Sequence, residues 1–235
     1  MNFISKQYIA LLPAAGIGSR MQADIPKQYL KIGQQTILET TLGVFLSHPD
    51  IARVVVVLHP EDQWFKHLAI AASDKVLTVF GGEERADSVL AGLGVIDQNA
   101  WVLVHDAARP CITHQDISKL IRHVELHADG AILATPVRDT MKRAASGKVE
   151  HTVSREQLWH ALTPQMFQVA PLKQCLSQAL KAGGQITDEA SAMEWAGQPV
   201  SIVVGRSDNI KVTCPEDLAL AEWYVSQQLN KEETA

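Results

Sequence analysis

Short apolar runs alternate with amphipathic segments along most of the 235-residue chain. Runs that are apolar on every side are typical of strands buried on both faces of a sheet. The predicted strands cover residues 8–13, 51–58, 76–80, 101–104, 131–135 and 200–204.

Between these runs, apolar residues recur at helical spacing, with stops such as Pro49–Asp50 and a predicted capping box at Thr213–Glu216. The predicted helices cover residues 36–48, 61–72, 85–96, 115–126, 171–181, 188–196 and 213–228. The alternation of strands and helices predicts an α/β fold with a doubly wound, mostly parallel sheet.

A different pattern follows the fifth predicted strand. Residues 138–143 and 148–153 flank Ala144–Gly147 and predict two short strands joined by a turn. An isolated two-stranded hairpin is marginally stable in water, so it needs a surface to lie on. We expect residues 137–158 to form a protruding β-hairpin arm that contacts a second copy of the chain in a homodimer. Because no repeat or low-complexity linker divides the chain, we expect residues 1–235 to form one domain.

The charge and cysteine content narrow the classes of partner. The formal net charge is -5, whereas a nucleic-acid-binding protein needs a basic face, and no apolar run is long enough to span a bilayer. Cys111, Cys175 and Cys214 are far apart and include no Cys-x-x-Cys pair, which favours reduced thiols in a cytoplasmic protein. We therefore expect no nucleic acid and no membrane as partners, while a small anion in a local basic pocket stays compatible with the composition.

The first predicted strand runs into a loop of small residues with two cations nearby. Gly16 and Gly18 let a backbone approach a ligand closely, and successive free N–H groups form a concavity for anions. Arg20 and Lys27 supply a planar fork and a mobile point charge for phosphate oxygens. A dinucleotide fingerprint would need a third glycine where Met21 stands, and the loop contains no P-loop sequence. The loop is either a plain strand–helix turn or a triphosphate site, and the two cations favour the triphosphate site.

Two further segments, Gly81–Gly82 and His105–Arg109, also follow predicted strands. Ligands of open α/β sheets bind outside the carboxyl ends of the strands, so we expect both segments beside the glycine loop. Asp106 has two interpretations: a turn-forming or helix-capping residue, or a carboxylate near a ribose hydroxyl or a phosphate-bound Mg²⁺. Lys211, in a short apolar segment predicted as a strand, is either an edge residue or points into a site.

The order of these motifs resembles that of a known enzyme family. The first loop is similar to the signature of nucleotidyltransferases with a glycosyltransferase-A-like fold, and the complete set is similar to the 2-C-methyl-D-erythritol 4-phosphate cytidylyltransferase family. The motifs are Leu12–Met21, Pro26–Tyr29, Gly81–Ser88, His105–Pro110, Leu158–Gln165, Thr187–Ala190 and Asn209–Thr213. The resemblance implies a Rossmann-like fold of the nucleotide-diphospho-sugar transferase type. It also implies transfer of CMP from CTP to methylerythritol phosphate, with release of pyrophosphate, in non-mevalonate isoprenoid synthesis.

The resemblance also implies roles for single residues. Those implied at the nucleotide are Pro13, Ala14, Ala15, Gly16, Gly18, Gly82, Ser88, Asp106 and Ala107. Those implied at the second substrate are Asp106, Arg109, Thr140, Arg155, Thr187 and Lys211. Those implied in catalysis are Arg20, Lys27, Arg155 and Lys211, of which Arg155 matches an arm residue that the family supplies from the partner subunit. Mg²⁺ is expected to be held mainly by CTP phosphates and water, with Asp106 as a candidate protein ligand. Glu83 stands where aspartate is as common in the family, which leaves base recognition open.

Three other functions fit parts of the sequence. A nucleotidyltransferase of the same fold that uses another triphosphate or sugar phosphate would differ only in its substrates. A NAD-dependent oxidoreductase would need the third glycine and an acidic ribose partner, and the chain lacks that pattern. A non-catalytic nucleotide sensor would share the phosphate-binding loop, and only turnover of the substrates separates it from an enzyme.

Overall fold

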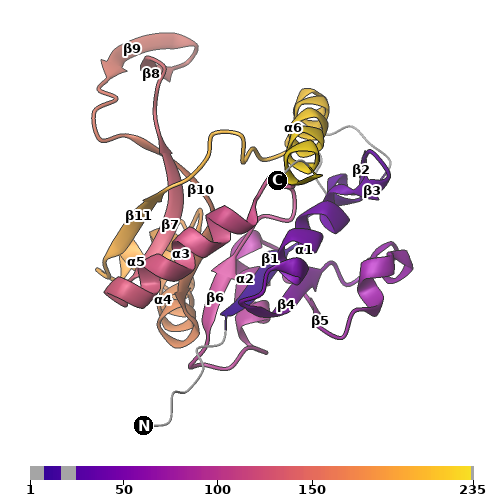
Figure 1. The fold of residues 1–235 in the computed structure, drawn as a ribbon. Helices are drawn as coiled ribbons and strands as arrows, with labels where there is room; N and C mark the ends of the chain where they lie inside the picture. The colour runs from indigo at the N-terminus through magenta and orange to yellow at the C-terminus, as the bar shows by residue number, and fades with distance from the viewer. Residues whose placement is uncertain (1–7, 17–24, 234–235) are drawn as a thin grey trace.

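A seven-stranded sheet with the strand order β11-β7-β10-β6-β1-β4-β5 forms the centre of the protein (Figure 1). The computed structural model describes residues 8–16 and 25–233, and their side chains as far as residue 230. The strands of the sheet are β1 (Tyr8–Pro13), β4 (Ile51–Leu58), β5 (Val76–Phe80), β6 (Trp101–Val104), β7 (Gly130–Pro136), β10 (Trp159–Gln168) and β11 (Val200–Val204). β10 runs antiparallel to β6 and β7, and the other neighbouring pairs are parallel. The predicted doubly wound, mostly parallel α/β fold is confirmed.

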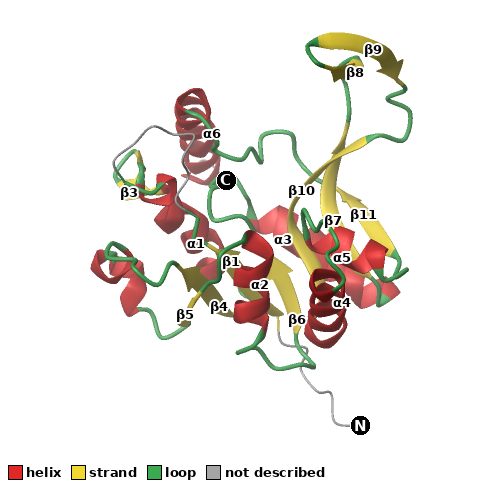
Figure 2. Ribbon diagram, turned by 180° about the vertical axis from the view of Figure 1, so that it is seen from behind, coloured by secondary structure: helices red, strands yellow, loops and turns green. Residues whose placement is uncertain are grey.

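Helices cover both faces of this sheet (Figure 2). They are α1 (Ile37–Ser47), α2 (Arg85–Leu93), α3 (His114–His127), α4 (Val169–Lys181), α5 (Glu189–Trp195) and α6 (Pro215–Glu233). Smaller elements are the 3-10 turns η2 (Lys27–Tyr29), η3 (Phe65–His67) and η4 (Ala69–Ala72) and the strand pair β2 (Lys31–Ile32) and β3 (Gln35–Thr36). Within the described residues, no helix has both the length and the apolar character needed to cross a membrane.

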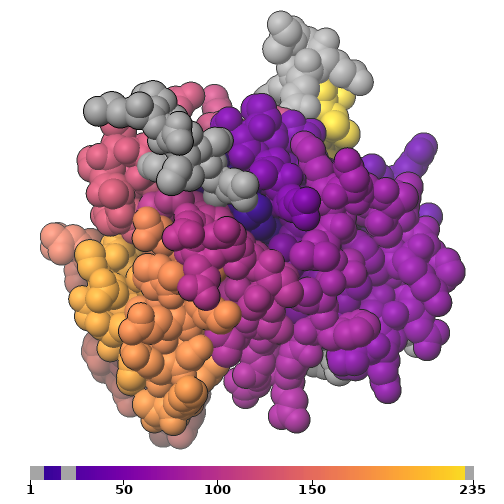
Figure 3. Space-filling view, turned by 90° about the horizontal axis from the view of Figure 1, so that it is seen from below, coloured from indigo at the N-terminus to yellow at the C-terminus, as the bar shows by residue number. Residues whose placement is uncertain are grey.

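Alternate side chains of β1 enter two separate apolar cores. Ala10 and Leu12 pack in the core that includes α1 and α3, whereas Ile9 and Leu11 pack in the core that includes α2 and α4. Successive side chains of a strand point to opposite faces, so a strand between two layers of helices must be apolar throughout. Seen from below, the surface passes from orange residues of the C-terminal half through magenta residues to purple residues of the N-terminal half, as the strand order requires (Figure 3).

The predicted hairpin arm is present and extends away from the sheet (Figure 1). Its strands β8 (Met141–Ala145) and β9 (Lys148–Val153) pair antiparallel in a sheet of their own, between β7 and β10 in the chain. All residues of β8 are exposed, and in β9 all are exposed except the half-buried Val153. Within the described residues, the body of the protein therefore provides little surface for the hairpin to lie on.

Three predictions of local structure are wrong. Residues 61–72 form the turns η3 and η4 instead of one helix, because Leu68 between them is extended (ψ 138°) and packs against the core. The last helix begins at Pro215, and the Asp217 carboxylate accepts the backbone N–H groups of Thr213 and Cys214, so the predicted Thr213–Glu216 pair does not cap it. Lys211 lies in a loop and not in a strand.

The sequence analysis also missed β10, a central strand. Thr163, Pro164 and Gln165 interrupt its apolar pattern, and proline and glutamine are uncommon in buried strands. The pairing of β10 with β7 is itself irregular between Ala161 and Gln165. This irregularity places Thr163 beside the end of β6, where it contributes to the site described below.

Candidate active site

A cavity of about 360 Å³ lies where β1, β5 and β6 end. These three strands belong to one parallel part of the sheet, so their carboxyl ends meet at the same edge. The residues assigned from the sequence that line this cavity are Pro13, Ala14, Ala15, Gly16, Lys27, Gly82, Ser88, Asp106, Ala107 and Lys211. The structure therefore brings together most of the predicted nucleotide-side residues and two of the predicted cations.

Close packing explains why the loop after β5 contains two glycines. A Cβ atom on Gly81 would lie 2.4 Å from Oγ of Ser88 and 2.9 Å from Cβ of Ala15. A Cβ atom on Gly82 would lie 2.4 Å from Cβ of Asp87. Only glycine lets this loop approach both the start of α2 and the loop after β1. The two glycines therefore bring the start of α2, with Ser88, to the edge of the cavity.

Three cations surround Asp106. Its Oδ1 atom lies 3.3 Å from Nε of Arg85, and its Oδ2 atom lies 3.2 Å from Nε of Arg109 and 3.1 Å from Nζ of Lys211. Burial acts to raise the pKa of Asp106, but the cations, Arg85 most strongly, hold the pKa of this carboxyl well below its usual range. Asp106 does not cap the following helix, since Thr113 caps α3. Its side chain is an ionised part of the cavity wall.

Arg85 and Glu189 are two site residues to which the sequence analysis gave no role. Both η nitrogens of Arg85 donate to the Glu189 carboxylate, Nη1 to Oε1 at 2.7 Å and Nη2 to Oε2 at 3.2 Å. Burial raises the pKa of Glu189, and Arg85 acts in the opposite direction. Both residues lie in motifs that resemble the family's, but no sequence spacing indicates that residues 85, 106 and 189 meet.

A buried histidine and a threonine hold the backbone around Asp106. The N–H group of Asp106 donates to Oγ1 of Thr163 at 3.1 Å, and this hydroxyl lies 3.0 Å from Nδ1 of His105. The Arg109 carbonyl, 3.1 Å from Nε2, can only accept, so in a neutral ring Nε2 carries the proton and Nδ1 accepts from the Thr163 hydroxyl. Burial lowers the pKa of His105 to about 4, so the ring is neutral at pH 7 and supports the loop without adding charge.

Lys27 reaches the cavity from the turn η2. Its Nζ atom donates to the Val212 carbonyl at 3.1 Å, and the Val212 N–H group donates to the Ala108 carbonyl at 2.8 Å. The neighbouring Gln28 donates to the Ala14 carbonyl at 2.7 Å. These bonds join the loops that carry Lys27 and Lys211 to the ends of β1 and β6.

Among the described residues that line the cavity, the surroundings of Asp106 decide whether it suits a metal ion. Both oxygens of Asp106 face cations, and a carboxylate in this position is poorly suited to bind Mg²⁺. No group of three or more His, Cys, Asp or Glu side chains with metal-ligating geometry occurs in the described part of the chain. The donor set does not fit Asp106 as a metal ligand.

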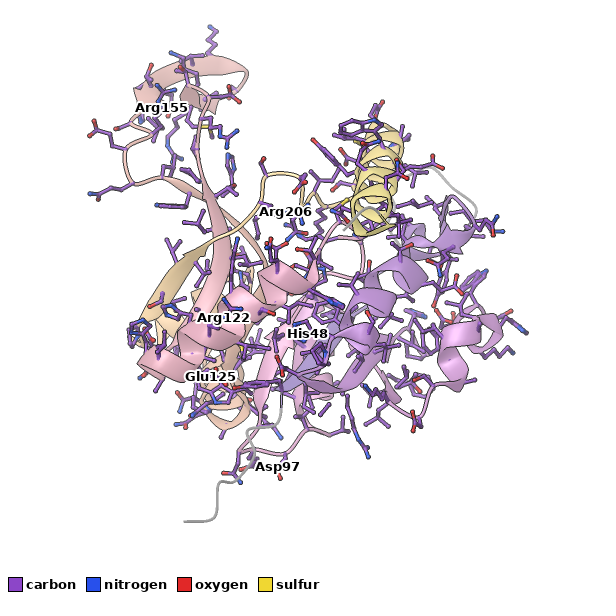
Figure 4. All side chains as sticks on the ribbon, viewed as in Figure 1. His48, Asp97, Arg122, Glu125, Arg155 and Arg206 are labelled. Atoms are coloured by element: carbon purple, nitrogen blue, oxygen red, sulfur yellow. The ribbon has the colours of Figure 1, made fainter. Side chains whose placement is uncertain are left out.

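Several predicted substrate residues lie outside the cavity of this chain. Thr140, Arg155 and Thr187 are exposed and do not line it. Arg155 lies on the arm, where its guanidinium donates to the Arg138 carbonyl (Figure 4). Arg109 contacts Asp106 without lining the cavity. Gly18 and Arg20, which the sequence assigned to the phosphate site, fall outside the described residues.

Comparison with known proteins identifies the family to which this chain belongs. Residues 8–227 match the family of 2-C-methyl-D-erythritol 4-phosphate cytidylyltransferases. A relative from Shewanella frigidimarina with this name is 60% identical over 227 residues, which cover 95% of this chain and 98% of the relative. A relative from Vibrio atlanticus with the same name is 58% identical over 227 residues, which cover 95% and 97%. The chain belongs to this family. It is therefore an enzyme of the nucleotidyltransferase class.

Solved structures agree with the family and the fold. A Francisella tularensis 2-C-methyl-D-erythritol 4-phosphate cytidylyltransferase superposes with a TM-score of 0.81 at 34% identity, covering 93% of this chain and 100% of that one. The cytidylyltransferase from Thermus thermophilus gives a TM-score of 0.77 at 29% identity, covering 92% and 98%. The cytidylyltransferase fold thus extends over nearly the whole chain.

Proposed function

We propose that this cytidylyltransferase-family chain transfers CMP from CTP to 2-C-methyl-D-erythritol 4-phosphate in the cavity at the ends of β1, β5 and β6. The products are 4-diphosphocytidyl-2-C-methyl-D-erythritol and pyrophosphate, in non-mevalonate isoprenoid precursor synthesis. The observation that carries the proposal is the cluster in which Lys211, Arg109 and Arg85 surround Asp106, beside Lys27 and the loop after β1. Such a cavity suits a substrate pair that brings several negative charges together.

In this proposal the nucleotide lies along the loop after β1. Pro13, Ala14, Ala15 and Gly16 line the cavity on one side, and Gly82 and Ser88 line it where the start of α2 approaches. We place the triphosphate on the first side and the cytosine on the second. Asp106 and Ala107 line the cavity at the end of β6, and we assign the ribose to them because a carboxylate accepts hydrogen bonds from ribose hydroxyls. Glu83 also lines the cavity, and since its carboxylate can only accept hydrogen bonds, we assign the main base contacts to backbone groups near Gly82.

The chemistry needs charge stabilisation more than proton transfer. The phosphate of methylerythritol phosphate is an oxyanion at neutral pH, so it attacks the α-phosphate of CTP without a general base. Lys27 and Arg20 stabilise the charge that develops on the α-phosphate and the leaving pyrophosphate. Lys211 and Arg155 orient the incoming phosphate, and fixed orientation lowers the entropic cost of bringing two anions together.

Mg²⁺ fits this proposal as part of the nucleotide and not of the protein. The metal would be held by triphosphate oxygens and water, a mode that Mg²⁺ favours, and it would neutralise phosphate charge. Asp106 serves in this arrangement as the partner of three cations.

The acceptor half of the site needs a second copy of the chain. We propose a single domain over residues 1–235 whose arm, residues 137–158, crosses to the partner subunit and supplies Arg155 there. Thr140 lies beside the arm strand β8 and Thr187 just before α5, both exposed, where a substrate or a partner arm has access to them. The exposure of every residue of β8 and of all β9 residues except Val153 supports a contact of the hairpin outside its own chain. We also propose a cytoplasmic location, since the three thiols are not disulfide-bonded.

Pyrophosphate release from CTP, measured with and without methylerythritol phosphate, tests the function directly. We expect release with both substrates and at most a small fraction of that rate with CTP alone. UTP, ATP and GTP are the matched controls for the base, and we expect each to be a much poorer substrate. A higher rate with another triphosphate would reject CTP as the donor, and nucleotide binding without turnover would favour a sensor.

A further inference from the structure

Glu189 is a buried carboxylate, 2% exposed, that lies behind the cavity wall. It does not line the cavity, whereas its partner Arg85 does. The guanidinium of Arg85 is engaged on two sides: its two η nitrogens bond to Glu189, and its Nε atom lies 3.3 Å from Oδ1 of Asp106. Arg85 therefore connects a buried carboxylate on α5 with the carboxylate at the centre of the site.

We propose that Glu189 is a positioning residue for the transfer reaction and acts on Asp106 through Arg85. The proposal rests on the function proposed above and adds a residue to it. Glu189 fixes the plane of the Arg85 guanidinium, so that only Nε faces Asp106. The negative charge of Glu189 also balances the positive charge of Arg85. The net positive charge that faces the phosphates then comes mainly from Lys27 and Lys211.

The planar fork of arginine explains why this arrangement is specific. The guanidinium is planar, and when one carboxylate holds both of its η nitrogens it cannot turn about the Cδ–Nε bond. The two carboxylate oxygens of Asp106 then have different partners: Oδ1 faces Arg85, and Oδ2 faces Lys211 and Arg109. Without Glu189, the η nitrogens of Arg85 would be free to turn toward Asp106. The Asp106 carboxylate would then move away from Lys211, the cation that we propose orients the incoming phosphate.

A purely structural role for Glu189 would be to anchor the start of α5. That task is already performed by neighbouring residues. The Asp188 carboxylate accepts the Ser191 N–H group at 2.9 Å and the Gln165 side-chain amide at 2.8 Å, while Oε1 of Gln165 accepts the Ala190 N–H group at 2.9 Å. The contact of Glu189 with Arg85 is therefore separate from the contacts that hold α5 on β10.

A double-mutant cycle between Glu189 and Asp106 tests this proposal, because the two carboxylates interact through Arg85. The kcat and the KM for each substrate are measured for the wild type, Glu189→Gln, Asp106→Asn and the double variant, with the Tm of each. Glu194→Gln removes a charge from an exposed position of the same helix and is the matched control. We expect Glu189→Gln to lower kcat about tenfold or more, on the scale of losses caused by small displacements of reacting groups. Glu194→Gln should change kcat less than twofold.

The proposal is tested by whether the effect of Glu189→Gln on kcat depends on the residue at position 106. In the Asp106→Asn background, we expect Glu189→Gln to lower kcat less than twofold further, because the residue through which it acts has changed. Equal losses in both backgrounds would overturn the proposal, as would a kcat of Glu189→Gln within twofold of wild type. If Glu189→Gln is unfolded at the assay temperature, the same cycle is measured with Arg85→Lys, which keeps the charge but cannot bridge both carboxylates. An inactive wild type would reject the proposed function, and an active wild type with an additive cycle would reject only this inference.

Discussion

The Nζ atom of Lys211 lies 3.1 Å from Oδ2 of Asp106, although Lys211 comes from the loop after β11 and Asp106 from the end of β6. The Lys211 side chain is 40% exposed and the Asp106 side chain 10% exposed. The pair thus has a buried carboxylate and an ammonium group that solvent and ligands can reach. A cation in this position is held in place before a phosphate arrives.

Lys211→Met should lower kcat/KM for methylerythritol phosphate roughly tenfold to a hundredfold, the scale of a lost hydrogen bond to a charged group. The KM for CTP should change much less, because Lys27 remains in the cavity. Lys31→Met, at an exposed position of β2, is the matched control and should leave both constants unchanged. A threefold or smaller loss in Lys211→Met would contradict the proposed role of this ammonium group in holding the acceptor.

Lys27→Ala should lower kcat about 100-fold or more, since one charge-stabilising donor near the transferred phosphate is lost. Its Nζ atom already bonds to the Val212 carbonyl at 3.1 Å, so the substitution also removes one of the bonds that hold the loop carrying Lys211. Steady-state kinetics with both substrates saturating measure the effect, and the Tm separates it from unfolding. A loss under threefold would show that Lys27 does not act in catalysis.

Arg155→Ala and Lys27→Ala should complement each other if the arm acts in the partner subunit. Each variant alone should be nearly inactive. After mixing and subunit exchange, half of the dimers are mixed, and each mixed dimer has one complete site, so roughly a quarter of wild-type activity should return. Analytical ultracentrifugation at micromolar concentration provides the control for dimer formation. A monomer, or a mixture no more active than its components, would place Arg155 in its own subunit or outside the site.

Gly16→Ala should raise the KM for CTP while leaving the Tm nearly unchanged. A Cβ atom at position 16 meets no described atom within 4 Å, whereas it would meet a triphosphate bound close to the backbone. Gly43→Ala, which also adds a Cβ atom with no described neighbour within 4 Å, lies in α1 and should keep the wild-type KM. An unchanged KM in Gly16→Ala would place the triphosphate elsewhere.

The free energy of unfolding should fall as the pH is lowered from about 6.5 to about 4, in part because of His105. Burial lowers the pKa of His105 from its ordinary value of 6.5 to about 4, so between these values the unfolded chain binds a proton that the folded chain does not. The stabilisation is present above pH 6.5 and is lost as the pH falls toward 4, by up to about 3 kcal/mol.

Urea denaturation at several pH values measures this dependence. His105→Asn should reduce the slope of unfolding free energy against pH in this window, and His67→Asn, at an exposed position, should not. Equal slopes in wild type and His105→Asn would mean that folding does not lower the pKa of His105.

The apolar pattern determined much of the fold directly. The strands Ile51–Leu58, Val76–Phe80, Trp101–Val104 and Val200–Val204 have the predicted bounds, because each is a short apolar run between polar or glycine-containing segments. The position of the glycine loop at the end of β1 was also predicted, since it depends on adjacent residues. Properties that depend on neighbours in the chain, such as the burial period of a strand, can be derived from sequence alone.

Only the tertiary structure decided the partners of Asp106. Arg85 at the start of α2 and Lys211 in the loop after β11 are distant in sequence from Asp106, and they meet it because these segments lie around one edge of the sheet. Glu189 of α5 joins the cluster through Arg85. The insertion of β10 between β6 and β7 was equally hidden, since Thr163 and Gln165 are polar residues satisfied by contacts with distant segments. Local sequence carries the periodicity that builds an element, whereas the charge environment of a buried carboxylate depends on which elements pack together.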